Sequence, residues 1–105
     1  MADFSKILEQ AAQMQSHLEK IQGELGKMSV RGSSGGGMVT VEADGKGQIT
    51  KVRVDPSIVN ASDVEMLEDL LLVALRDAQQ KSTDLAKQEM GKLTGGMGLP
   101  FKLPF

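Results

Sequence analysis

The sequence has 105 residues, a length typical of a single domain. It contains no cysteine, which excludes disulfides, thiol nucleophiles and cysteine-ligated metals. The net charge of −2 and the pI of about 5.3, taken alone, argue mildly against a polyanionic partner. No stretch reaches the roughly 18 apolar residues that a membrane span requires. Charges in the first ten residues argue against a signal peptide, so we expect a cytoplasmic protein with no membrane partner.

A first helix is predicted over residues 3–27. Its apolar residues recur at alternating steps of three and four, a heptad pattern. They are Phe4, Ile7, Ala11, Met14, Leu18, Ile21, Leu25 and Met28. A helix of this length is roughly 37 Å long. Because a small sheet cannot cover it, part of the apolar seam must face another helix or project from the body.

Three strands are predicted to follow. Residues 39–44 alternate apolar and polar side chains, and residues 49–54 return as the second strand of a hairpin through the Asp44-Gly45 turn. Ile49 falls out of phase, which predicts a bulge or an edge position near Thr50. Residues 28–32 are interpreted as a short first strand that joins the hairpin through a glycine-rich loop, giving a three-stranded antiparallel meander.

A second helix is predicted from a capping box at Ser62 and Glu65 to about Leu93. Its residues 70–75 read Leu-Leu-Leu-Val-Ala-Leu and cover every face of a helix. One sheet face cannot bury them all, so we infer a dimer interface here. The candidate interface residues are Val52, Val54, Leu67, Leu70, Leu71, Ala74 and Leu75.

The expected fold class is therefore α+β, with one domain at residues 1–94 and a Gly/Pro-rich tail at residues 95–105. Phe101 and Phe105 suggest that this tail docks somewhere and is not left free in solution. The low aromatic content, three Phe and no Trp or Tyr, limits the core of a monomer. Oligomerisation is a common remedy at this size.

No constellation for catalysis is evident. His17 is the only histidine and is expected on the surface, and the acidic residues Glu65, Glu68 and Asp69 are explained by helix capping and the helix dipole. The glycine run 32–37 lacks the Gly-Lys-Ser/Thr of a phosphate-binding loop. We expect no enzyme, no metal, no cofactor and no small-molecule substrate.

Four segments together resemble the YbaB/EbfC family of nucleoid-associated bacterial proteins. They are QAAQMQ at residues 10–15, GMVTVEADGKGQITKVRVDPSIV at 37–59, EMLEDLLLVALRDAQQK at 65–81 and GMGLPFKLPF at 96–105. The resemblance implies an α-β-β-β-α protomer in a tweezer-like homodimer. It also implies binding of double-stranded DNA with little or limited sequence preference, with effects on nucleoid organisation and gene expression.

The resemblance places the DNA contacts on the two long helices, and phosphate contact relies on Lys and Arg. The DNA-binding candidates are Lys6, Lys20, Lys27, Arg31, Lys81, Lys87 and Lys92. The sheet and first loop add further cations at Lys46, Lys51 and Arg53. The first helix has a net charge close to zero, so binding is expected to be weak to moderate and salt-sensitive. The alternative is a protein-interaction module in which the heptad face of this helix binds a partner helix.

Overall fold

The computed structural model describes the backbone of residues 2–96 and the side chains of residues 4–92. Helix α1 spans Ala2–Leu25, and the strands are β1 at Ser29–Ser34, β2 at Val39–Asp44 and β3 at Ile49–Val54. Helix α2 spans Val64–Gly96, and short 3-10 turns lie at Gly35–Gly37 and Pro56–Ile58. This is the predicted α+β fold in the predicted order.

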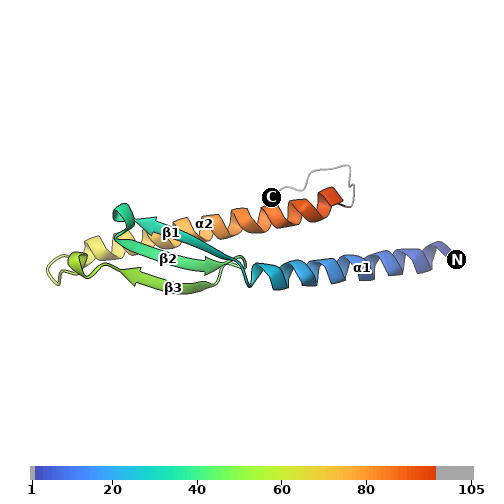
Figure 1. Cartoon of the computed structure of the whole chain (residues 1–105), viewed down its shortest axis with the longest axis horizontal. Helices are drawn as coiled ribbons and strands as arrows, with labels where there is room; N and C mark the ends of the chain where they lie inside the picture. The colour runs from blue at the N-terminus through green and yellow to red at the C-terminus, as the bar shows by residue number, and fades with distance from the viewer. Residues whose placement is uncertain (1, 97–105) are drawn as a thin grey trace.

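The protomer is long and thin (Figure 1). Its principal extents are 72 × 23 × 17 Å and its radius of gyration is 19.6 Å, whereas a compact chain of this length would have a radius of about 13 Å. Both α1 and the C-terminal part of α2 extend from the same end of the sheet. We call these the α1 prong and the α2 prong, the latter comprising residues 83–96.

The sheet is an antiparallel meander in the order β1-β2-β3, as predicted. The register of β2 and β3 steps from Glu42 opposite Lys51 to Ala43 opposite Ile49, which leaves Thr50 as the additional residue of a bulge. The Thr50 hydroxyl donates a hydrogen bond of 3.2 Å to the Glu42 carbonyl. The bulge predicted from the phase of Ile49 is therefore confirmed.

Helix α2 packs on one face of β1 and β2. The core there consists of small and medium side chains: Val39, Val41, Ala43, Ala74 and Ala78. The Ser34 hydroxyl donates to the Leu70 carbonyl at 2.6 Å, and the Ser82 hydroxyl donates to the Asp44 carbonyl at 2.8 Å. These two bonds fix α2 at both ends of its contact with the sheet.

The α1 prong is attached to the body at its C-terminal end. Leu25 is buried, and its carbonyl accepts a hydrogen bond of 2.8 Å from the backbone N–H of Gly45 in the β2–β3 turn. A Cβ on Gly45 would lie 2.8 Å from that same carbonyl oxygen. Gly45 is therefore required for close approach, whereas the positive φ of this turn lies at Gly47.

Two local predictions need correction. The side chain that caps α2 is Asp63, whose carboxylate accepts from the Met66 N–H at 3.2 Å, whereas the Ser62 hydroxyl instead donates to Asn60. The carboxylate competes well for this position because it complements the positive end of the helix dipole. Strand β1 runs on to Ser34, since the chain adopts positive φ only from Gly35 onward.

Two helix ends also differ from the prediction. Helix α1 ends at Leu25, two residues earlier than predicted, where Gly26 follows. Helix α2 continues through Gly95 to Gly96. The predicted docking of the tail through Phe101 and Phe105 lies outside the described residues.

Candidate nucleic-acid interface

The candidate lysines of the α1 region, Lys6, Lys20 and Lys27, are all exposed. Within residues 4–92 none of them forms an ion pair. The sequence of α1 nevertheless contains two lysines against four carboxylates, and Lys27 follows the helix. The α1 prong is therefore acidic on balance, which disfavours close contact with phosphates along its whole length.

The three candidate lysines of α2 differ in their partners. Lys81 forms an ion pair with Asp77 at 3.3 Å and donates to the Arg31 carbonyl at 2.9 Å. Lys92 pairs with Glu89 at 3.2 Å, whereas Lys87 has no ion pair in the described structure. Lys87 is thus the α2 lysine most available to an external anion.

Asp77 links α2 to the edge of the sheet. Its carboxylate accepts from the Ser33 backbone N–H at 3.0 Å and lies beside the Lys81 ammonium. The Ser33 N–H, followed by Lys81, lowers the pKa of Asp77 below its usual value. Lys81 consequently has a structural role in holding α2 against β1.

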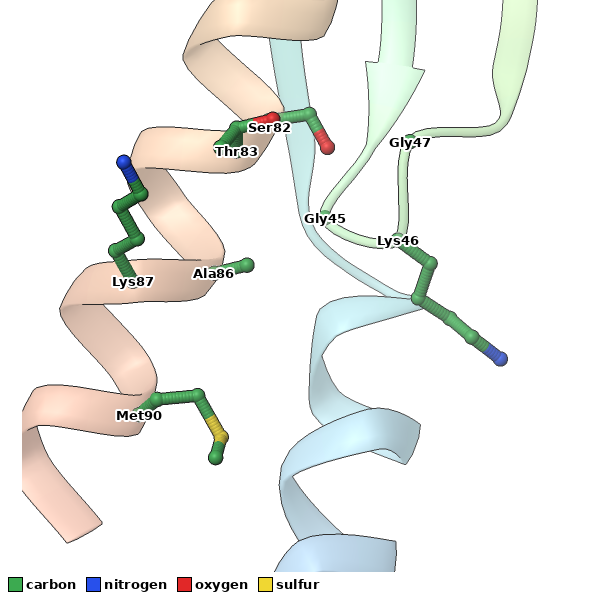
Figure 2. A pocket seen from close by; sticks show the side chains of 8 residues that line it. All are labelled: Gly45, Lys46, Gly47, Ser82, Thr83, Ala86, Lys87 and Met90. Atoms are coloured by element: carbon green, nitrogen blue, oxygen red, sulfur yellow. The ribbon is translucent and has the colours of Figure 1, made fainter. Parts of the chain in front are cut away.

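A pocket of about 270 Å³ lies where the α2 prong leaves the sheet (Figure 2). It is lined by Gly45, Lys46, Gly47, Ser82, Thr83, Ala86, Lys87 and Met90. In Figure 2 the ammonium groups of Lys46 and Lys87 point away from the pocket, while small side chains and Met90 form its wall. The pocket itself is therefore not an anion cradle, although cations flank it.

The outer face of the sheet, away from α2, gathers more cations. A pocket of about 190 Å³ there is lined by Arg31, Gly37, Thr40, Glu42, Lys51 and Arg53. Arg31 pairs with Glu42 at 3.1 Å, and among the described residues Lys51 and Arg53 form no ion pair. Lys51 and Arg53 are not among the DNA-binding candidates predicted from the sequence. Their alternation with Val52 and Val54 already indicated that both cations lie on one face of the strand, opposite the valines.

The candidate interface residues occupy two environments. Ala74 is fully buried in the protomer, and Val54, Leu70, Leu71 and Leu75 pack partly buried against the same core. Leu67 is half-buried. Val52 is 48% exposed, although its partner across the strands, Val41, is fully buried on the same sheet face.

Other apolar side chains are open to solvent in the single protomer. On α2 they include Leu72 and Val73, and on the α1 prong they include Phe4, Ile7 and Leu8. The α1 residues are about 60% exposed (63%, 60% and 57%). Apolar surface of this extent is typical of a chain that binds another polypeptide.

The described residues contain no helix long and apolar enough to cross a membrane. Over the same range no group of three or more His, Asp or Glu side chains is placed to hold a metal ion. Fold and surface together define a two-pronged α+β protein with both charged and apolar side chains exposed on its surface.

Comparison with known proteins identifies the family. The model of the YbaB/EbfC DNA-binding family matches residues 1–97. A nucleoid-associated protein of Gemmatimonas aurantiaca is 45% identical over 98% of this chain and 99% of its own length. One from Paramagnetospirillum magneticum is 48% identical over the whole of both chains. The chain belongs to the YbaB/EbfC DNA-binding family, which is not a known enzyme family.

The fold has a close structural counterpart. The crystal structure of an uncharacterized protein from Helicobacter pylori matches with a TM-score of 0.72 and 23% identity. The match covers 90% of this chain and 95% of that chain. At this identity the likeness supports the fold alone.

Proposed function

We propose that the protein is a nucleoid-associated homodimer that binds double-stranded DNA with little sequence specificity and acts at the nucleoid in the cytoplasm. Membership of the YbaB/EbfC DNA-binding family over residues 1–97 carries this proposal. The names of the relatives as nucleoid-associated proteins support it. The binding would influence nucleoid organisation and gene expression.

Dimer formation is supported by how little the single protomer buries. The largest fully buried side chains are Val39 and Val41, and α2 covers β1 and β2 but leaves β3 outside its main contact. A second copy seated on the open strip of Val52 and Val54, and on the adjoining α2 leucines, would remove this apolar surface from water. Ala74 is already buried, so its role is in the protomer core.

DNA binding is supported by the cations that form no ion pair within residues 4–92. Lys87 lies on the α2 prong, and Lys6, Lys20 and Lys27 lie on or next to α1. Phosphate contacts of this kind carry no sequence information. An interface built on such phosphate contacts would bind DNA with low sequence specificity.

The role of the α2 prong is tested by the double substitution Lys87→Ala/Lys92→Ala. Lys81 stays intact because it holds α2 against β1. Titration of a labelled duplex by fluorescence anisotropy should show weaker binding and a salt slope lower by about one for each phosphate contact removed. The control is Gln88→Ala, an exposed neutral position between the two. A salt slope equal to that of the wild type would exclude this prong from the DNA interface.

A protein-interaction module is the second candidate function, favoured by the exposed Phe4, Ile7 and Leu8. In this function the heptad face of α1 would bind an apolar partner helix. The substitutions Phe4→Ser and Ile7→Ser separate the two functions. They should leave DNA affinity unchanged if DNA is the partner, and they should abolish helix binding if α1 recruits a protein.

A further inference from the structure

We infer that the outer face of the sheet is a second phosphate-binding surface, which contacts the backbone of duplex DNA independently of the prongs. The inference rests on the proposed DNA binding and assigns part of it to the sheet. We define the basic sheet face as Arg31, Lys51 and Arg53 together with Thr40 and Glu42 of the central strand.

The strand register brings these side chains together. Glu42 of β2 lies opposite Arg31 on one side and Lys51 on the other, so the three residues form one row across the sheet. Arg53 lies opposite Thr40 in the next row that faces the same way. Lys51 and Arg53 are two residues apart on one strand, so their Cα atoms are separated by about 7 Å. The cations thus line both sides of the central strand.

The charge of this face is more favourable to an anion than that of either prong. Three cations oppose one carboxylate on the basic sheet face, whereas the sequence of α1 has more acidic than basic residues. The α2 prong carries Lys87 and Lys92 against Asp84 and Glu89. Since counterion release depends on local cation density, the sheet is the better placed of these surfaces to contact phosphate.

The residue types fit a phosphodiester. The two arginines present planar guanidinium groups that bind phosphate oxygens through paired N–H donors, and Thr40 adds a hydroxyl. The Arg31 side chain remains 66% exposed while it pairs with Glu42, so further N–H donors are available to a ligand. Glu42 competes with the ligand for Arg31 and repels phosphate, so its neutralisation should strengthen binding.

Edge-strand protection is the simpler explanation for Lys51 and Arg53. Charged side chains on an edge such as β3 prevent pairing with other chains. That role predicts that a variant without the charges of Lys51 and Arg53 aggregates and that its DNA affinity does not change. It also gives no reason why removal of the Glu42 charge should increase affinity.

The test uses the full chain and a labelled duplex of about two helical turns. The double variant Lys51→Gln/Arg53→Gln and the single variant Glu42→Gln are titrated from low salt to about 0.15 M salt. The control for the single variant is Glu65→Gln, which changes the net charge equally on the first turn of α2. Circular dichroism and light scattering verify that each variant is folded and keeps the oligomeric state of the wild type.

At 0.1 M salt, two lost phosphate contacts should weaken binding by up to about 60-fold and lower the salt slope by about two. Glu42→Gln should bind several-fold more tightly than Glu65→Gln. If the wild type binds DNA but the double variant keeps its affinity and slope, the inference is wrong and the proposed function stands. Equal gains for the two Glu→Gln variants would also overturn it, because net charge alone would then explain the effect. If the wild type binds no duplex at any salt concentration, the proposed function fails, and the inference with it.

Discussion

Gly32 of β1 lies directly against the backbone of Ala78 in α2. A Cβ placed on Gly32 would be 2.8 Å from the Ala78 Cα atom and would also overlap the Ala78 nitrogen and the Ala74 carbonyl oxygen. Backbone atoms of a helix cannot move aside as the end of a flexible side chain can. The absent side chain of Gly32 therefore sets the distance between the helix and the sheet, and with it the position of the α2 prong.

Gly32→Ala should destabilise the protein by about 1–3 kcal/mol or more, where 1–3 kcal/mol is the usual cost of overpacking. The cost arises because the whole of α2 must shift to accept one methyl group. Chemical denaturation followed by circular dichroism measures the change. Gly23→Ala is the matched control: no atom lies within 4 Å of its added Cβ, and alanine is favoured over glycine in a helix by about 1 kcal/mol. A Gly32→Ala variant as stable as the wild type would show that α2 does not pack on β1 this closely.

The Asp77 carboxylate should make stability depend on pH. The Ser33 N–H and then Lys81 lower the pKa of Asp77 in the folded protein below its ordinary value of 3.8. The carboxylate's contribution is therefore fully present above about pH 5, well above the unfolded pKa, and is lost as the pH falls through the lower folded pKa. The melting temperature of Asp77→Asn should thus lie below that of the wild type at pH 7, and the difference should shrink as the pH falls through the folded pKa of Asp77.

Asp55 also has a lowered pKa, because it accepts from the Ser57 N–H. Asp55 is present in both the wild type and Asp77→Asn, so the difference between their melting temperatures reports on Asp77 alone. Asp69→Asn provides a control on the same helix, at a carboxylate with no hydrogen bond or ion pair in the described structure. A constant difference between wild type and Asp77→Asn from pH 7 to pH 3 would contradict the assignment.

Val52→Asp should dissociate the proposed dimer and leave the protomer fold largely intact. Val52 is exposed in the protomer, so its replacement creates no cavity there, but a carboxylate buried against a second copy has no partner. We expect the dimer dissociation constant to rise at least about 100-fold. Sedimentation velocity measures it. Leu71→Asp is less selective, because Leu71 packs against the protomer's own core.

Lys51→Asp is the control for this prediction. It introduces the same group at the adjacent position, where the side chain points to the opposite face of the sheet. This variant should remain dimeric. If Val52→Asp and the wild type form dimers of equal stability, the interface does not include the open strip of Val52 and Val54.

Most of the fold is predictable because its signals are periodic and local. Alternation fixes residues 39–44 and 49–54 as strands, and the misplaced Ile49 correctly signals the bulge at Thr50. The helix cap was assigned one residue too early, since Ser62 and Asp63 are both good capping residues. Only the backbone conformation at these two residues decides which of them caps the helix.

The candidate site is less predictable because it depends on contacts between distant residues. The role of Gly32 in helix packing is not local, and its sequence context resembles a loop. The grouping of Arg31 with Lys51 and Arg53 depends on the strand register. Lys81 contacts Asp77 and the Arg31 carbonyl. The contact with Arg31 can be recognised only when the position of α2 on the sheet is known.

The central claim, that the protein binds double-stranded DNA as a nucleoid-associated homodimer, is tested most directly by an anisotropy titration of the wild type. Two labelled duplexes of unrelated sequence, each about two helical turns long, are titrated from low salt to about 0.15 M. We predict saturable binding of both duplexes with similar affinity. Each protein unit bound to DNA should contain two chains, as expected for a homodimer. We also predict a steep loss of affinity with salt that corresponds to several phosphate contacts. Absence of binding to either duplex at the lowest salt would contradict the claim.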